Sequence, residues 1–239
     1  MPRRIPRKTA APLLPLHPTL NSLRESAAGC RACDLWKKGT QTVFGEGART
    51  ADVMFVGEQP GDREDLAGKP FVGPAGGVLN KALQVAGIDR SQVYVTNIVK
   101  HFKWEPRGKR RIHKKPNAIE IAACRPWFDA EVAVTRPRVI VALGATAAQA
   151  LLGKDFKVTQ RRGEPIEWQP QSEGIGAGAS EGKTNLPHRA VVVATVHPSS
   201  ILRAPDDESR HAEMAKFIDD MKAIARIIRE SEERPRKAA

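Results

Sequence analysis

The chain has 239 residues with 39 Lys or Arg against 27 Asp or Glu, so its formal net charge is +12 at pH 7. Hydrophobic residues make up 41% of the chain, enough for a buried core, which excludes disorder throughout. No stretch approaches the ~20 apolar residues that span a bilayer, and the basic start at Met1 lacks a signal peptide's apolar centre. We therefore expect a cytoplasmic protein, not associated with a membrane, whose partner is a polyanion.

The two ends and one internal segment differ in composition from the rest of the chain. Residues 1–18 hold four Lys or Arg among five prolines, which predicts a disordered basic tail. We expect a single domain over 19–230 and a C-terminal tail over 231–239. Glycine and serine recur between 170 and 187, which indicates a flexible surface insertion.

Four compact apolar runs predict buried strands, at about 51–57, 92–99, 138–143 and 191–196. Helical patterns alternate with them, at about 19–29, 78–86, 116–134, 145–152 and 209–230. The alternation predicts an α/β protein, a three-layer α/β/α sandwich around a central, mainly parallel four-stranded sheet. We expect loops over 58–74 and over 100–115.

Polar residues or glycine follow all four strands, at Glu58, Asn97, Gly144 and His197. Ligands bind outside the carboxyl ends of parallel strands, so these positions converge on a candidate site. Any one of them could simply begin a loop, but four together favour a site. Asn97 offers a donor and an acceptor for a nucleobase edge, unless it only completes a turn.

His197 could stabilise a developing anion, and the backbone around Ser199 and Ser200 could hold a phosphate; the alternative is a capping or core histidine. The loop after Glu58 lacks the Lys-Ser/Thr ending of a P-loop, which disfavours a phosphorylated cofactor. It can instead place a carboxylate, an amide and the ring of Phe71 around a flat ligand.

The segment 100–115 contains eight Lys or Arg and one Glu, with Phe102 and Trp104 among them. This pattern suits phosphate contacts and stacking on unpaired bases, although such runs are often only solvated surface. Cys30 and Cys33 form a metal-type pair, Cys124 adds a third thiol, and His101 is the best fourth ligand. These ligands suit zinc or an iron-sulfur cluster equally, and buried, unliganded thiols are the alternative.

Four motifs resemble those of the family 4 uracil-DNA glycosylases, in the same order and over about residues 20–225. They are Gly57-Glu-Gln-Pro-Gly61, Pro70-Phe-Val-Gly73, Thr96-Asn-Ile-Val-Lys100 and His197-Pro-Ser199. Gln59 and the run Lys109-Arg-Arg-Ile-His113 depart from family 4 and are similar to the X-type, DNA-crosslinking branch (UdgX).

The resemblance implies a uracil-DNA glycosylase sandwich with a 4Fe-4S cluster held by Cys30, Cys33, His101 and Cys124. It implies that Phe71 stacks on flipped-out uracil, that Asn97 and Gln59 contact the base, and that His197 stabilises the departing anion. Glu58 would take the place of the residue that handles water. Lys109, Arg110, Arg111, Ser199, Ser200 and Arg203 would bind DNA.

In an X-type enzyme a neutral His113 would attack C1′ after uracil leaves, and the protein would stay attached to its product. Glu58 or Gln59 would hold the imidazole, and the nearby Lys and Arg would disfavour its protonation. We therefore expect a monomeric, single-turnover DNA repair enzyme acting on uracil-containing DNA, single strands included. The alternatives are a multiple-turnover family 4 glycosylase and a non-catalytic DNA-binding module.

Overall fold

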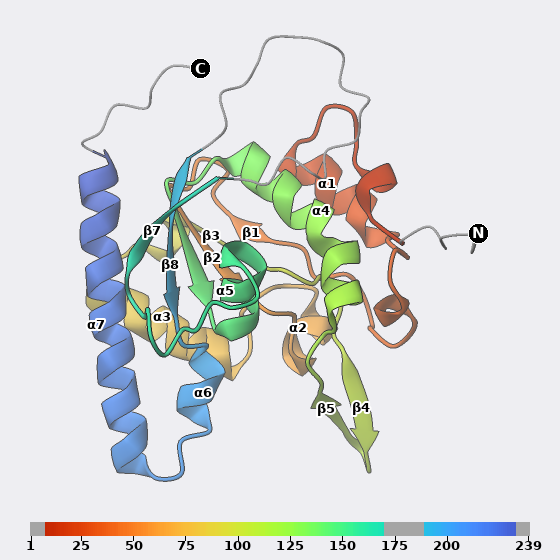
Figure 1. Ribbon diagram of the computed structural model, residues 1–239. Coiled ribbons are helices and arrows are strands. Elements are labelled where there is room, and N and C mark those ends of the chain that lie inside the picture. Colours follow the sequence, from red (N-terminus) through yellow and green to blue (C-terminus); the bar gives the residue numbers. More distant parts are fainter. Residues whose placement is uncertain (1–7, 170–188, 233–239) are drawn as a thin grey trace.

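The computed structural model describes residues 8–169 and 189–232. They form a six-stranded sheet of order β1-β3-β2-β6-β8-β7, with helices on both of its faces (Figure 1). The four central strands run parallel: β3 (Val93–Asn97), β2 (Val53–Gly57), β6 (Val139–Leu143) and β8 (Ala190–Thr195). The edge strands β1 (Glu46–Gly47) and β7 (Pro165–Trp168) are antiparallel to their neighbours. The α/β fold and the four parallel strands are confirmed, whereas the two short edge strands were missed.

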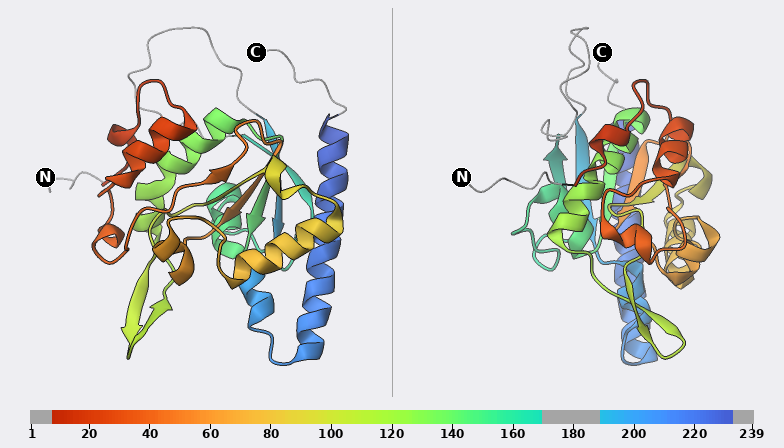
Figure 2. Two further views of the ribbon diagram at one scale, coloured as in Figure 1. Left: turned by 180° about the vertical axis from the view of Figure 1, so that it is seen from behind. Right: turned by 90° about the vertical axis from the view of Figure 1, so that its right-hand side faces the viewer.

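Side chains alternate between the two faces of the sheet, so each strand contributes to two cores. Met54 and Val56 of β2 face the layer of α1 (Leu20–Ala28), α4 (Ala118–Thr135) and α5 (Ala145–Leu152). Val53 and Phe55 face the layer of α3 (Pro74–Ala86), α6 (Pro198–Leu202) and α7 (Asp207–Glu232). Helix α5 lies in front of the sheet in Figure 1, and α3 lies in front in the reverse view of Figure 2. The molecule is therefore the expected three-layer sandwich.

Both segments expected to be loops contain regular structure. Helix α2 (Asp62–Ala67) lies in the first, and the second forms a hairpin of β4 (Trp104–Arg107) and β5 (Arg110–His113). The hairpin projects from the carboxyl edge of the sheet (Figure 1). Short 3-10 turns complete the described elements, at Ala11–Leu13, Asp34–Lys37 and Arg90–Gln92.

The N-terminal tail, expected over residues 1–18, is shorter than predicted. Ala10 is fully buried, and its backbone N–H donates to the carbonyl of Ala123 over 2.9 Å, so residue 10 already packs on α4. The insertion expected at 170–187 and the tail beyond 232 lie outside the described residues, as do residues 1–7. The single domain over 19–230 stays a prediction. Of the helices described, none has the length and apolar character needed to cross a bilayer.

Candidate active site

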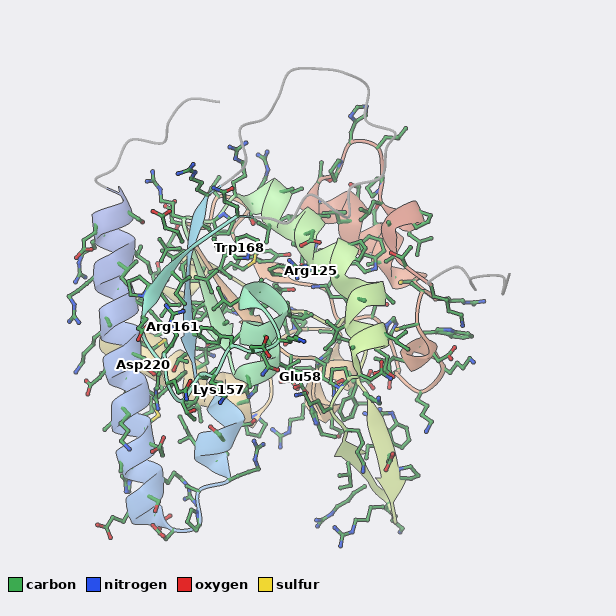
Figure 3. The ribbon with its side chains drawn as sticks, in the orientation of Figure 1. Glu58, Arg125, Lys157, Arg161, Trp168 and Asp220 are labelled. Atoms are coloured by element: carbon green, nitrogen blue, oxygen red, sulfur yellow. The ribbon has the colours of Figure 1, made fainter. Side chains whose placement is uncertain are left out.

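The carboxyl ends of the parallel strands bring the predicted site residues together. Gly57, at the end of β2, is paired with Asn97, at the end of β3. Glu58 accepts a hydrogen bond from the hydroxyl of Thr146, in the first turn of the helix that follows β6. The ends of β6 and β8 also meet, at Gly144 and His197. A Cβ atom built on Gly144 would lie only 3.0 Å from the Cβ of His197. Figure 3 shows Glu58 between α5 and the base of the hairpin.

Asn97 and Phe71 are two buried residues of the site. Asn97 is only 3% exposed, and no hydrogen bond joins its side-chain amide to another described residue. A Cβ at Gly57 would overlap the Asn97 side-chain oxygen and lie 2.9 Å from Cζ of Phe71, so only glycine fits beneath them. The ring of Phe71 is nearly parallel to that of His197, with an interplanar angle of 28° and centroids 6.2 Å apart. A buried amide beside two flat rings suits a planar heterocycle.

The backbone at Phe71 is held in an unfavourable conformation. Its φ is 55°, in the left-handed region that residues with a side chain rarely adopt. The buried carboxylate of Glu64 accepts the N–H of Gly61 and of Gly73, which fixes the segment on both sides of the ring. Sequence reasoning missed Glu64, although a Glu three residues after a helix-capping position is a known signal.

His197 caps α6, and this fixes its tautomer. Its Nδ1 accepts the backbone N–H of Ser199 over 3.2 Å and lies 2.8 Å from the Ser199 hydroxyl. Nδ1 is therefore unprotonated, so the proton of the neutral ring is on Nε2. Burial, reinforced by Arg203 and His113, lowers the pKa of His197 to about 4. At neutral pH the ring can donate a hydrogen bond from Nε2 to a developing anion.

His113 ends β5 and lies against the Glu58 carboxylate. Its Nε2 is 3.4 Å from Glu58 Oε1, and its ring is 6.1 Å from that of Phe102. The His113 side chain is 50% exposed, and partial desolvation lowers its pKa; Glu58 raises the pKa, and Arg203 lowers it. We expected the Lys and Arg of the hairpin to disfavour the imidazolium, but partial desolvation is the first cause, and the cation that contributes is Arg203, directly after α6.

Gln59 holds the base of the hairpin. Its side-chain N–H donates to the carbonyls of Lys103 and Lys114, and its side-chain oxygen accepts the N–H of Lys103. These distances are 3.1–3.2 Å, and Gln59 is buried. Of the two residues expected to hold His113, Glu58 therefore contacts the imidazole, whereas Gln59 fixes the backbone on which it is carried.

The six residues expected to bind DNA have different surroundings. Lys109 and Arg110, at the hairpin tip, are exposed, as are Ser200, on α6, and Arg203, which follows α6. Arg111 instead pairs with Asp62 and with the fully buried Asp65 of α2, which anchors the hairpin. The hydroxyl of Ser199 accepts a hydrogen bond from Arg203 and contacts His197. Arg111 and Ser199 thus serve the site's architecture.

The four expected metal ligands are all buried. The indole N–H of Trp127 donates to Cys30 Sγ over 3.3 Å, and the backbone N–H of Lys100 donates to Cys124 Sγ over 3.2 Å. Burial raises the pKa of Cys33, and raises that of Cys124 to about 12. Cys30 and His101 also line a cavity of about 160 Å³. Among described residues, no three His, Cys, Asp or Glu side chains are grouped closely enough for one metal ion.

A buried ion pair connects this region to Asn97. The ammonium of Lys100, which is 1% exposed, donates to Glu131, to the Thr96 hydroxyl and to the Asn97 carbonyl over 2.6–2.7 Å. Glu131 also accepts from Tyr94 and from the Gly45 N–H. Both charges are thus compensated by hydrogen bonds, as burial requires. The network fixes the backbone of Asn97 from the core side of the sheet.

A family model and several relatives of this chain all describe uracil-DNA glycosylases. Residues 44–222 match the family model described as "Uracil DNA glycosylase superfamily". The chain is 39% identical to the type-4 uracil-DNA glycosylase of Thermotoga maritima, over 78% of this chain and 84% of that protein. It is 33% identical to the type-4 enzyme of Sulfurisphaera tokodaii, over 79% and 78% of the two chains. It is 31% identical to the type-4 uracil-DNA glycosylase of Archaeoglobus fulgidus, over 85% of this chain and 93% of that protein.

Proposed function

This chain belongs to the uracil DNA glycosylase superfamily, and we propose that it excises uracil from DNA and then binds covalently, through His113, to C1′ of the abasic site. By this proposal it would be an enzyme of the X-type, DNA-crosslinking branch. The observation that carries the proposal is the imidazole of His113, whose Nε2 lies 3.4 Å from Glu58 Oε1 at the carboxyl edge of the sheet and whose pKa is lowered. A neutral imidazole is a nucleophile, and a carboxylate beside it can take the proton that it loses.

Excision would use Phe71, Asn97 and His197 at the strand ends. Flipped-out uracil stacks on Phe71, and the free amide of Asn97 binds its polar edge. As the bond from C1′ to N1 breaks, its electrons go to uracil, and the Nε2–H of His197 donates to the oxygen that becomes negative. The sugar is left with an electron-poor C1′.

Capture would follow at the same carbon. One ring nitrogen of His113 supplies its lone pair to C1′, forming a carbon-nitrogen bond. The imidazolium so formed loses the proton on its other nitrogen to Glu58. No water is consumed, so the product stays on the protein. In the alternative, a multiple-turnover glycosylase, water reaches C1′ first and free abasic DNA is released.

We propose that a monomer binds the DNA strand, with single-stranded substrate accepted, across the hairpin tip and α6. The exposed cations Lys109, Arg110 and Arg203 would neutralise flanking phosphates, and Ser200 would add a polar contact. Such contacts release counterions, so affinity should fall steeply with rising salt.

We also propose that Cys30, Cys33, His101 and Cys124 hold a 4Fe-4S cluster. Hydrogen bonds to the sulfurs of Cys30 and Cys124, and the cavity beside His101, fit such a group. A single zinc ion needs its ligands around one point, whereas a four-iron cluster spreads them over a larger body. When bound, the cluster would tie the start of the hairpin to α1 and α4. Iron, sulfide and a visible iron-sulfur absorption in the purified protein are expected; zinc alone would refute this assignment.

The decisive experiment uses an oligonucleotide with one uracil, boiled with the protein in SDS and run on a denaturing gel. A shifted band is expected with uracil and not with thymine. It should disappear in His113→Ala and persist in His211→Ala, a matched change of an exposed histidine on α7. Uracil release followed by free abasic DNA, with no shifted band, would identify a multiple-turnover enzyme. DNA binding without uracil release would identify a non-catalytic module.

A further inference from the structure

Thr146 is a buried hydroxyl residue at the site that the reaction above does not use. The Ala-rich helix that contains it looks like a packing element in the sequence, and Thr146 is only 6% exposed. Its hydroxyl nevertheless donates to Oε2 of Glu58, a residue 88 positions earlier in the chain. A threonine hydroxyl in the first turn of a helix often contacts its own backbone, so this contact with a distant carboxylate needs a reason.

The two oxygens of Glu58 have different partners. Oε2 accepts from Thr146, and Oε1 lies 3.4 Å from Nε2 of His113. The backbone of Glu58 is also fixed, because its carbonyl accepts the N–H of Val99 over 3.0 Å. The terminal torsion of a glutamate side chain is otherwise broad, so a partner on one oxygen determines where the other points.

The start of α5 is itself held in place. Gly144 has a φ of 89°, and its N–H donates to the carbonyl of Thr195 over 2.8 Å, which ties the start of the helix to β8. Thr146 follows two residues later. The hydroxyl that reaches Glu58 is therefore presented by a rigid element rather than by a loop, which is what precise positioning requires.

We propose that Thr146 is a positioning residue that orients the Glu58 carboxylate toward His113, and so controls how often an excised uracil leads to covalent capture. The inference rests on the proposed function. Thr146 makes no hydrogen bond within the described chain to Phe71, Asn97 or His197, the residues proposed for excision, so it should affect capture more than excision.

The test measures uracil release and SDS-resistant adduct in the same single-turnover reaction. Thr146→Val removes the hydroxyl and keeps the shape, and Thr146→Ser keeps the hydroxyl. We expect Thr146→Val to form roughly tenfold less adduct per uracil released, since a hydrogen bond to a charged group is lost. Thr146→Ser should stay within about twofold of wild type. Thr135→Val, which removes a buried hydroxyl bonded to Glu131 O, is the matched control and should leave the ratio unchanged.

A second measurement separates positioning from general damage to the fold. Glu58 raises the His113 pKa, so a carboxylate that turns away should leave that pKa lower in Thr146→Val than in wild type, as read by NMR titration of the imidazole. An unchanged ratio in Thr146→Val, or an equal loss in Thr146→Ser, would overturn the inference. No adduct in wild type would instead refute the proposed capture reaction. If Thr146→Val does not fold, the Ser variant and Thr146→Ala supply the same comparison.

Discussion

The site at the strand ends and the hairpin that carries His113 are built in different ways. Asn97 and Phe71 are buried, and they rest on the central strands, the loop held by Glu64 and the ion pair of Lys100. The hairpin has two four-residue strands with mostly exposed side chains. A two-stranded hairpin is barely stable alone, so this one depends on its anchors, Gln59 and Arg111. The groups proposed for excision are thus fixed by the core, and the proposed nucleophile by a few side chains.

The largest effect is expected from the site at the strand ends. Asn97→Ala removes the amide proposed to bind the base, which should cost about 1–3 kcal/mol, or roughly 5- to 150-fold in single-turnover uracil release. Adduct should fall in parallel, because capture follows excision. Asn80→Ala, on the exposed face of α3, is the control. Unchanged uracil release would remove Asn97 from the site.

Loosening the hairpin should separate the two reactions. Gln59→Ala deletes three hydrogen bonds to the backbone at its base, each contributing about 0.5–1.5 kcal/mol. We expect roughly tenfold less adduct per uracil released, while release itself changes by about twofold or less. Gln149→Ala, which removes a side-chain bond to Phe156 O, should leave both unchanged. A parallel loss of both reactions in Gln59→Ala would show that the hairpin also supports excision.

A smaller effect is expected in the pH dependence of stability. The pKa of His197 is about 4 in the folded protein against 6.5 for the ordinary group, so the unfolded state takes up a proton first as the pH falls. The stability that the neutral ring provides is therefore complete above about pH 6.5 and is lost toward pH 4. Between pH 7 and 5 we expect a loss of roughly 1–2 kcal/mol in urea unfolding. His197→Asn, which keeps a capping side chain, should reduce this loss; an identical pH dependence would contradict it.

The smallest effect is expected from the outer surface of the hairpin. Glu105 and Lys114 form an ion pair whose side chains are about half exposed, and such pairs contribute little to stability. Glu105→Ala should leave the adduct ratio and the thermal midpoint unchanged. A strong loss of adduct would mean that cross-strand contacts, and not only Gln59 and Arg111, hold His113 in place.

The sequence predicted the site at the strand ends better than the hairpin, for a physical reason. Long apolar runs mark central strands, and parallel strands bring their carboxyl ends together, so Asn97 and His197 could be placed from periodicity alone. The hairpin strands are rich in charge and lack an apolar face, and their anchors come from residues more than 40 positions away, such as Gln59. Helix α2 is only six residues long, too short for a helical pattern to emerge.

The contacts among the predicted residues were the part that sequence could not supply. Gln59 and Glu58 were both expected to hold His113, and only the folded chain shows that one touches the ring and the other the backbone. Arg111 was assigned to DNA because it lies in a basic run, yet two carboxylates of α2 neutralise it. Thr146 gave no signal at all, since its partner is far away in the chain.

His197 caps α6 and is also proposed to stabilise the departing anion, so its presence alone does not indicate activity. The same ring nitrogen that sets the tautomer for anion stabilisation also closes the first turn of α6. A related protein that had lost its activity would still have a structural reason to keep a histidine or another capping residue here. A histidine at this position in a newly sequenced gene is therefore weak evidence of glycosylase activity. The unpartnered amide of Asn97, for which the described fold provides no hydrogen bond, is the better marker to look for.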